Sequence, residues 1–124
     1  MLIGHMGAKG YYSAMEHAAM MIGNSSSGIL EAASFGLPVI NIGDRQKGRE
    51  VSPNVIQADG TGEALTSAIT RAQSAAFKAL CAAKENVYGD GHAAEKIVGA
   101  VAAFLEKGTG PRKAFHPLEA GAET

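Results

Sequence analysis

Short apolar segments along the chain change their spacing several times. Three short and mostly apolar segments have the length and composition of buried strands: residues 20–22, 39–42 and 55–57. Five segments have the spacing of an amphipathic helix: residues 11–19, 29–35, 63–72, 74–84 and 92–106. In the first helix we expect Tyr12, Met15 and Ala19 to share the buried face. Strands that alternate with helices predict an α/β fold, a parallel sheet flanked by helices on both faces.

Two polar segments interrupt this pattern directly after predicted strands. Residues 23–28, the serine loop, read Gly-Asn-Ser-Ser-Ser-Gly and follow the first strand. Residues 43–50, the arginine loop, follow the second strand and begin a segment, residues 43–53, that we expect to be exposed. Ligands of parallel sheets bind beyond the carboxyl ends of the strands. The two loops are therefore the candidate site.

The serine loop has the composition of an anion-binding turn. A helix is expected to begin near Ser27, so backbone N–H groups should converge where the helix dipole is positive. The hydroxyls of Ser25, Ser26 and Ser27 add donors suited to phosphate oxygens, and Gly28 is expected to let a ligand approach closely. The alternative is that these residues only cap the helix.

A carboxylate and several cations accompany this turn. Glu31 is expected in the first turn of the helix, where it could accept hydrogen bonds from vicinal sugar hydroxyls. Its alternative role is to stabilise the helix dipole, by about 0.3–1 kcal/mol. In the arginine loop, Arg45 or Arg49 could bind a diphosphate through two parallel hydrogen bonds. The alternative is a solvated charged loop.

Two long motifs carry a family resemblance. The segment IGNSSSGILEA at residues 22–32 and the segment FGLPVINIGDRQKGR at residues 35–49 closely resemble the UDP-N-acetylglucosamine 2-epimerase family, in its hydrolysing form used in sialic and legionaminic acid pathways. The turn YGDG at residues 88–91 matches the turn before that family's terminal helix. The resemblance extends over residues 11–105.

The resemblance implies the C-terminal Rossmann-like domain of a glycosyltransferase-B type fold, N-terminally truncated. By position, it implies that Ser25 and Ser26 hold the diphosphate of UDP, that Glu31 holds the ribose hydroxyls, and that Arg45 contributes to the nucleotide site. The family reaction eliminates UDP from UDP-N-acetylglucosamine and then hydrates the glycal to N-acetylmannosamine. The ligand is therefore expected to be UDP or a UDP-N-acetylhexosamine.

The same resemblance implies that the family's proton-transfer carboxylates lie in a part that this chain lacks. Asp44 is a poor replacement, because an exposed aspartate opposite Arg45 should stay ionised and act as its structural partner. The four histidines are dispersed and show no metal-ligand spacing, and Cys81 lies among alanines as a small buried residue. We therefore predict no catalytic residue, no cofactor and no metal.

Composition and charge narrow the classes of partner and the cellular compartment. The 124 residues carry a formal net charge of −1 without a long basic run, which disfavours nucleic acid as a partner. The longest apolar stretch, residues 18–22, is far shorter than the roughly 20 residues of a membrane span. One cysteine and no signal-like segment predict a cytoplasmic protein. We expect a partial UDP-binding domain over residues 1–107 and a flexible tail over residues 108–124.

Three hypotheses about function remain open at this point. The chain is the nucleotide-binding part of an epimerase and is inactive alone, or a noncatalytic UDP-binding or oligomerisation module, or half of a split epimerase. The second hypothesis depends on the apolar positions of the last predicted helix, Ile97, Val98, Val101, Phe104 and Leu105, which we expect to need a partner. That partner is a second copy of the chain or an N-terminal domain.

Overall fold

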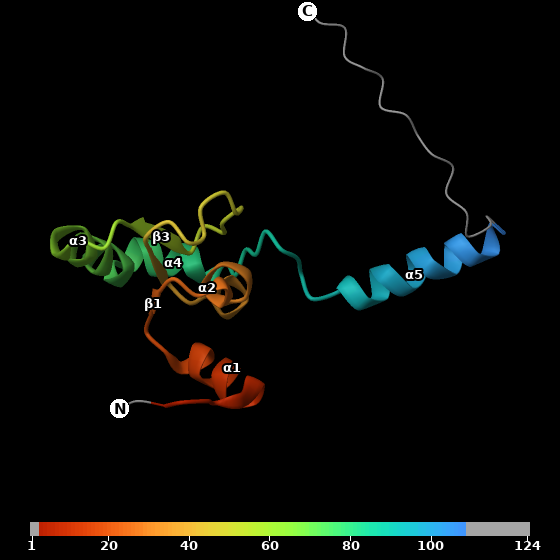
Figure 1. Ribbon diagram of the computed structural model, residues 1–124, viewed down its shortest axis with the longest axis horizontal. Helices are drawn as coiled ribbons and strands as arrows, with labels where there is room; N and C mark the ends of the chain where they lie inside the picture. The colour runs from red at the N-terminus through yellow and green to blue at the C-terminus, as the bar shows by residue number, and fades with distance from the viewer. Residues whose placement is uncertain (1–2, 109–124) are drawn as a thin grey trace, which may run out of the picture. The chain divides into compact units, whose positions relative to one another are not determined.

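The sheet consists of three parallel strands in the order β1-β2-β3 (Figure 1). The computed structural model describes residues 3–108, and the chain divides into two units between Asp90 and Gly91. The strands belong to the first unit and are β1 Met21–Gly23, β2 Val39–Ile42 and β3 Val55–Ala58. The helices of this unit are α1 Gly7–His17, α2 Ser26–Leu30, the 3₁₀-helix η1 Ala32–Phe35, α3 Gly62–Gln73 and α4 Ala75–Ala82.

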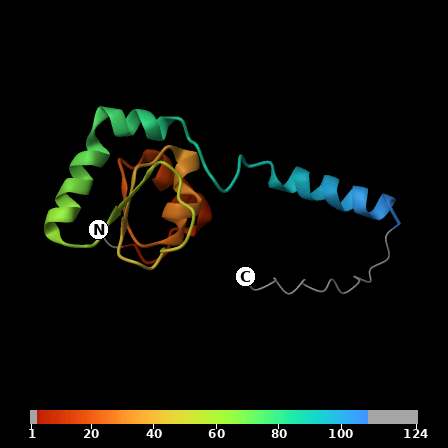
Figure 2. The ribbon, with the colours of Figure 1, turned by 90° about the horizontal axis from the view of Figure 1, so that it is seen from above.

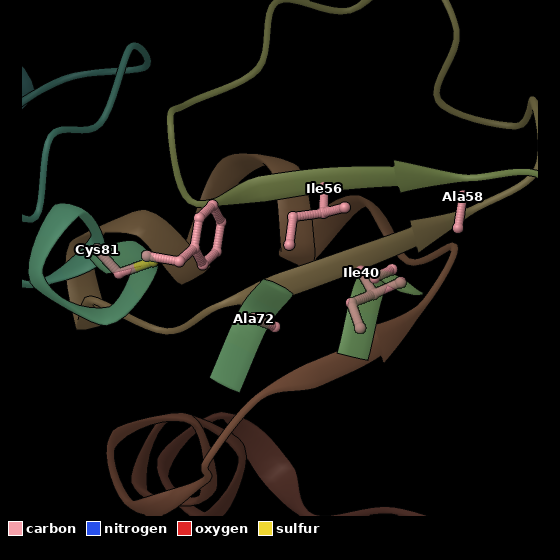
Figure 3. Close-up of a cluster of buried hydrophobic side chains, with 7 residues drawn as sticks. Ile40, Ile56, Ala58, Ala72 and Cys81 are labelled. Carbon is pink, nitrogen blue, oxygen red and sulfur yellow. The ribbon is translucent and has the colours of Figure 1, made fainter. Parts of the chain in front are cut away.

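Each face of the sheet is buried by different helices. On one face Ile40 and Ile56 pack in a cluster with Ala72 of α3 and Cys81 of α4 (Figure 3). On the other face Val39 packs in a second cluster, to which α1 contributes Met15 and η1 contributes Ala32. Side chains alternate between the two faces of a strand, which explains why neighbours in β2 enter different clusters. The predicted α/β class, with a parallel sheet flanked by helices, is confirmed.

A single serine sets the bend between α3 and α4 (Figure 2). The Ser74 hydroxyl donates to the carbonyl oxygen of Arg71 at 2.8 Å and accepts from the backbone N–H of Phe77 at 3.2 Å. The Arg71 guanidinium lies 5.3 Å from the centre of the Phe77 ring. One side chain thus satisfies the end of α3 and the beginning of α4, and such caps contribute about 1 kcal/mol each. The predicted helices at 63–72 and 74–84 are confirmed, with a shorter second one.

The first helix differs from the prediction in its bounds and its buried face. It begins at Gly7, and it ends at His17 because Ala18 is extended, with ψ of 148°. Tyr11 packs with Met15, one turn away, whereas Tyr12 is 42% exposed. Ala19 lies beyond the helix and is exposed. The expected buried face of Tyr12, Met15 and Ala19 is therefore wrong for two of its three residues.

The helix predicted at residues 29–35 is divided into α2 and η1. Glu31 lies between them as the C-cap of α2, and not in a first helical turn as predicted. Ala32 at the start of η1 is fully buried in the cluster around Val39, a tertiary contact that local spacing does not encode. Gly36 ends η1 with φ of 67°, the left-handed conformation that glycine adopts most easily.

The connection from β2 to β3 is held by buried polar side chains. Gln46 and Ser52 are only 5% and 1% exposed, although residues 43–53 were predicted to form an exposed loop. The Ser52 hydroxyl accepts from the backbone N–H of Val87 at 3.1 Å. The Asn54 amide donates to the carbonyl oxygen of Leu37 at 2.8 Å. These side chains satisfy backbone groups that lie outside regular structure.

The second unit contains α5, Ala93–Glu106, which confirms the predicted helix at residues 92–106. None of its residues is buried, and its larger apolar side chains fall on one helical face: Ile97, Val98, Val101, Phe104 and Leu105. Residues 109–124 of the predicted tail lie outside the described residues. No helix within residues 3–108 is long and apolar enough to cross a membrane.

Candidate functional site

An open cavity of about 590 Å³ lies beside the serine loop, which follows β1. Its walls come from the loop, from α1 and from the residues that precede α1, and they include Tyr11, Tyr12, Ser25, Ser27 and Glu31. A cavity of this size is in the range that takes a small organic ligand. Three of the six residues predicted for the site therefore meet around one space.

The serine hydroxyls of this wall form a hydrogen-bonded pair. Ser25 is the N-cap of α2, and its hydroxyl oxygen accepts from the backbone N–H of Ser27 at 3.4 Å. The hydroxyl oxygens of the two serines are 3.3 Å apart. Ser25 thus serves as the helix cap that the alternative interpretation expected, and it is also exposed on the cavity wall.

Two tyrosines of α1 reach the predicted site residues. The hydroxyls of Tyr11 and Ser27 are hydrogen-bonded, and the Tyr12 hydroxyl donates to the Glu31 carboxylate at 3.4 Å. The backbone N–H of Glu31 donates to the carbonyl oxygen of Ser27 at 3.0 Å, so the two residues lie one turn apart. The wall therefore presents hydroxyl groups beside a carboxylate.

Sequence reasoning missed these tyrosines, and it also missed His5. The His5 ring lines the same cavity and its Nδ1 accepts from the backbone N–H of Gly7 at 3.0 Å. The local sequence pattern carried no signal that these three residues line the cavity. Their positions depend on how α1 and the residues before it are placed against the serine loop.

Gly28 and Ser26 have other surroundings than Ser25. Gly28 is buried, and a Cβ atom placed on it would lie 3.0 Å from Cγ1 of Val39, so this glycine faces the sheet and not the cavity. In the structure this glycine packs α2 closely on β2, and its expected role of admitting a ligand stays a prediction. Ser26 is exposed at the first position of α2 and is not among the residues of the cavity wall.

The arginine loop lies next to the serine loop. β1 and β2 are parallel neighbours, so the loops that follow them leave the same edge of the sheet. The Gln46 side-chain amide donates to the carbonyl oxygen of Asn24 at 2.8 Å, which joins the two loops directly. Arg45 is exposed, and within the described part of the chain no ion pair joins it to Asp44. The expected pairing of these two residues is therefore wrong.

The helix dipole contributes little at this site. α2 has only five residues, so the dipole that the prediction invoked is small. In the part of the chain that the structure describes, no three histidine, cysteine, aspartate or glutamate side chains gather as metal ligands would. Cys81 is buried, and burial raises the pKa of its thiol, as expected for a packing residue. The cavity wall thus offers serine and tyrosine hydroxyls and one carboxylate to a ligand.

Comparison with known proteins gives a relationship over most of the chain. The sequence model of the family described as UDP-N-acetylglucosamine 2-epimerase matches residues 1–102. This match includes the first ten residues, which the motif resemblance left out and which contribute His5 to the cavity.

Individual relatives agree with this match. The chain is 39% identical over 95 residues to a UDP-N,N'-diacetylbacillosamine 2-epimerase (hydrolyzing) of Legionella pneumophila, an alignment covering 77% of the chain and 24% of the relative. It is 46% identical over 77 residues to a GDP/UDP-N,N'-diacetylbacillosamine 2-epimerase (hydrolyzing) of Campylobacter jejuni. That alignment covers 62% of the chain and 20% of the relative. It is 31% identical over 108 residues to the polysialic acid biosynthesis protein P7 of Escherichia coli. That alignment covers 87% of the chain and 28% of the relative.

The chain thus spans about a quarter of the length of these relatives: 24%, 20% and 28%. The family match over residues 1–102 includes the parallel sheet and both strand-end loops. The chain belongs to the UDP-N-acetylglucosamine 2-epimerase family.

Proposed function

We propose that the chain forms the nucleotide-binding part of a hydrolysing 2-epimerase that acts on a UDP-N-acetylhexosamine. The observation that carries this proposal is the meeting of Ser25, Ser27 and Glu31 around one cavity, in a chain of this family. The names of two relatives support the substrate class, because both include a UDP-linked diacetylbacillosamine and the word hydrolyzing.

The proposed ligand divides between the two strand-end loops. Ser25 and Ser27 donate hydrogen bonds to the diphosphate from the cavity wall, Ser26 donates from the exposed first position of α2, and Arg45 reaches the same group from the arginine loop. Glu31 accepts hydrogen bonds from the ribose hydroxyls. Its carboxylate already accepts a hydrogen bond from Tyr12, which supports its role as an acceptor beside the cavity.

In the proposed reaction the chain stabilises the leaving group. A base removes the proton from C2 of the sugar, and the C1–oxygen bond breaks so that its electron pair leaves with UDP. Water then adds across the double bond of the glycal. Donors aimed at the departing diphosphate lower the barrier to this bond cleavage. We assign no described residue to proton removal, and we expect no turnover from residues 1–124 alone.

UDP titration followed by amide NMR tests the binding site. We expect millimolar UDP to shift the amide resonances of residues 25–31 and 44–46, and to leave those of α3 unchanged. If the resonances of the serine loop do not shift at millimolar UDP, the proposal is contradicted.

A substitution at Glu31 tests whether its carboxylate binds the ribose. The Glu31→Gln substitution should weaken UDP binding about tenfold, because hydrogen bonds to a charged acceptor are worth roughly 1.5–3 kcal/mol. It should also abolish the preference of the chain for UDP over 2′-deoxy-UDP. The matched control is Glu16→Gln, an exposed carboxylate of α1 that does not line the cavity. A preference that persists in Glu31→Gln would place the ribose elsewhere.

A second candidate function is association through α5. Its apolar face, formed by Ile97, Val98, Val101, Phe104 and Leu105, favours a partner surface, because exposed apolar patches of this kind are commonly interaction sites. We propose that in the isolated chain this partner is a second copy.

A further inference from the structure

Gln46 connects the two loops of the candidate site. Its Nε2 donates to the carbonyl oxygen of Asn24 at 2.8 Å, across a sequence separation of 22 residues. Gln46 is only 5% exposed, whereas its neighbours Arg45 and Lys47 are exposed. The arginine loop thus turns one polar side chain inward and its charged side chains outward.

The beginning of the same loop is fixed independently. The Asn41 amide donates to the side-chain oxygen of Gln57 at 2.7 Å, and the Gln57 amide donates to the carbonyl oxygen of Gly43 at 2.8 Å. Asn41 is only 3% exposed, so this chain of amides starts inside the sheet. Arg45 therefore lies between two anchored points, Gly43 and Gln46.

Stability alone does not explain a glutamine at position 46. Its Oε1 atom is buried and has no hydrogen-bond partner among the described residues. A buried unpaired carbonyl is unfavourable, and an apolar side chain of the same length would avoid that penalty. Asn24 is exposed, so water could replace the hydrogen bond to its carbonyl oxygen. What an apolar residue cannot supply is a directional link between the loops.

We propose that Gln46 is a positioning residue that fixes the arginine loop against the serine loop, so that Arg45 and the serine hydroxyls act on one diphosphate. This inference rests on the proposed UDP site. Gln46 is not among the residues of the cavity wall, so its proposed effect is transmitted through the position of Arg45.

The substitution Gln46→Met in the full chain separates positioning from folding. Methionine keeps the length of the side chain and removes the donor. We expect UDP affinity to fall about tenfold, comparable to the loss of a charge-assisted phosphate contact, and uridine affinity to stay unchanged. The thermal midpoint should stay the same or rise. The matched control is Gln73→Met, at an exposed glutamine of α3, which should change neither affinity.

Hydrogen exchange of the loop amides supplies a measurement that needs no ligand. Gln46→Met should accelerate exchange at residues 44–49 and leave β2 unchanged. Unchanged exchange, or equal losses of UDP and uridine affinity, would overturn the positioning role. If the unsubstituted chain does not bind UDP, the proposed function and the diphosphate role of Gln46 both fail, and the exchange data still decide whether Gln46 orders the loop.

Discussion

Gly28 lies where α2 packs tightly against the sheet. A Cβ atom there would lie 3.0 Å from Cγ1 of Val39, and Val39 is itself only 2% exposed. Valine has few alternative rotamers, so it cannot move away easily. The glycine therefore sets the distance of the serine loop from β2, and with it the position of the cavity wall.

The substitution Gly28→Ala is expected to destabilise the fold by about 1–3 kcal/mol, because overpacking forces shifts in a filled core. The comparison is Gly10→Ala in α1, where a Cβ atom would meet only the Cβ of Met6 at 3.6 Å. That variant should gain roughly 0.5–1 kcal/mol of helix stability. Urea unfolding measures both changes. A neutral Gly28→Ala would mean that Val39 repacks.

At the scale of elements, α3 illustrates a helix whose start is defined by two polar residues. The Thr61 hydroxyl accepts from the backbone N–H of Ala64 at 3.3 Å as the N-cap. The Asp59 carboxylate accepts from the backbone N–H and the hydroxyl of Thr61, each at 2.9 Å. These hydrogen bonds hold the pKa of Asp59 below its ordinary value of 3.8, and the one from the backbone N–H of Thr61 has the largest effect.

A lowered folded-state pKa makes the start of α3 sensitive to acid. The stabilisation by ionised Asp59 is complete above the unfolded-state pKa and is lost as pH falls through the lower, folded-state pKa. Asp59→Asn should therefore lower the thermal midpoint at pH 7, and the difference from the unsubstituted chain should shrink as pH falls below about 4. Glu85→Gln, at an exposed acid, serves as the control. A difference that stays constant to pH 2.5 would contradict this account.

At the scale of the whole molecule, the apolar face of α5 is the feature that most favours association. It repeats over two turns of a 14-residue helix, and none of the residues of α5 is buried. Burying apolar area is the main driving force for protein association. Copies of the chain thus have a surface through which they could pair.

Light scattering over a range of concentrations should give a mass that rises above that of one chain. The paired substitutions Val101→Ser and Leu105→Ser should reduce this rise, because both positions lie on the apolar face. The control is Ala103→Ser, which falls on the opposite side of the helix by its spacing. A constant monomeric mass for the unsubstituted chain would exclude association through α5.

Local patterns in the sequence are sufficient to predict the class of the fold and the family. Alternating apolar runs and helical spacing are local properties, so they predicted the three strands, α3 and α5. The motifs at residues 22–32 and 35–49 carried the family resemblance, and the family match confirmed it. The edge of the sheet that carries the candidate site also followed from the order of strands and loops.

Which side chains form the cavity and which support it depends on contacts between distant segments of the chain. From α1, Tyr11 reaches Ser27 and Tyr12 reaches Glu31, and Gln46 reaches Asn24 from the arginine loop. Gly28 faces the sheet, although its place in the motif indicated the ligand side. These roles depend on contacts between segments 11 to 22 residues apart. Local propensity cannot encode such contacts, because they form only when helices and loops pack on the completed sheet.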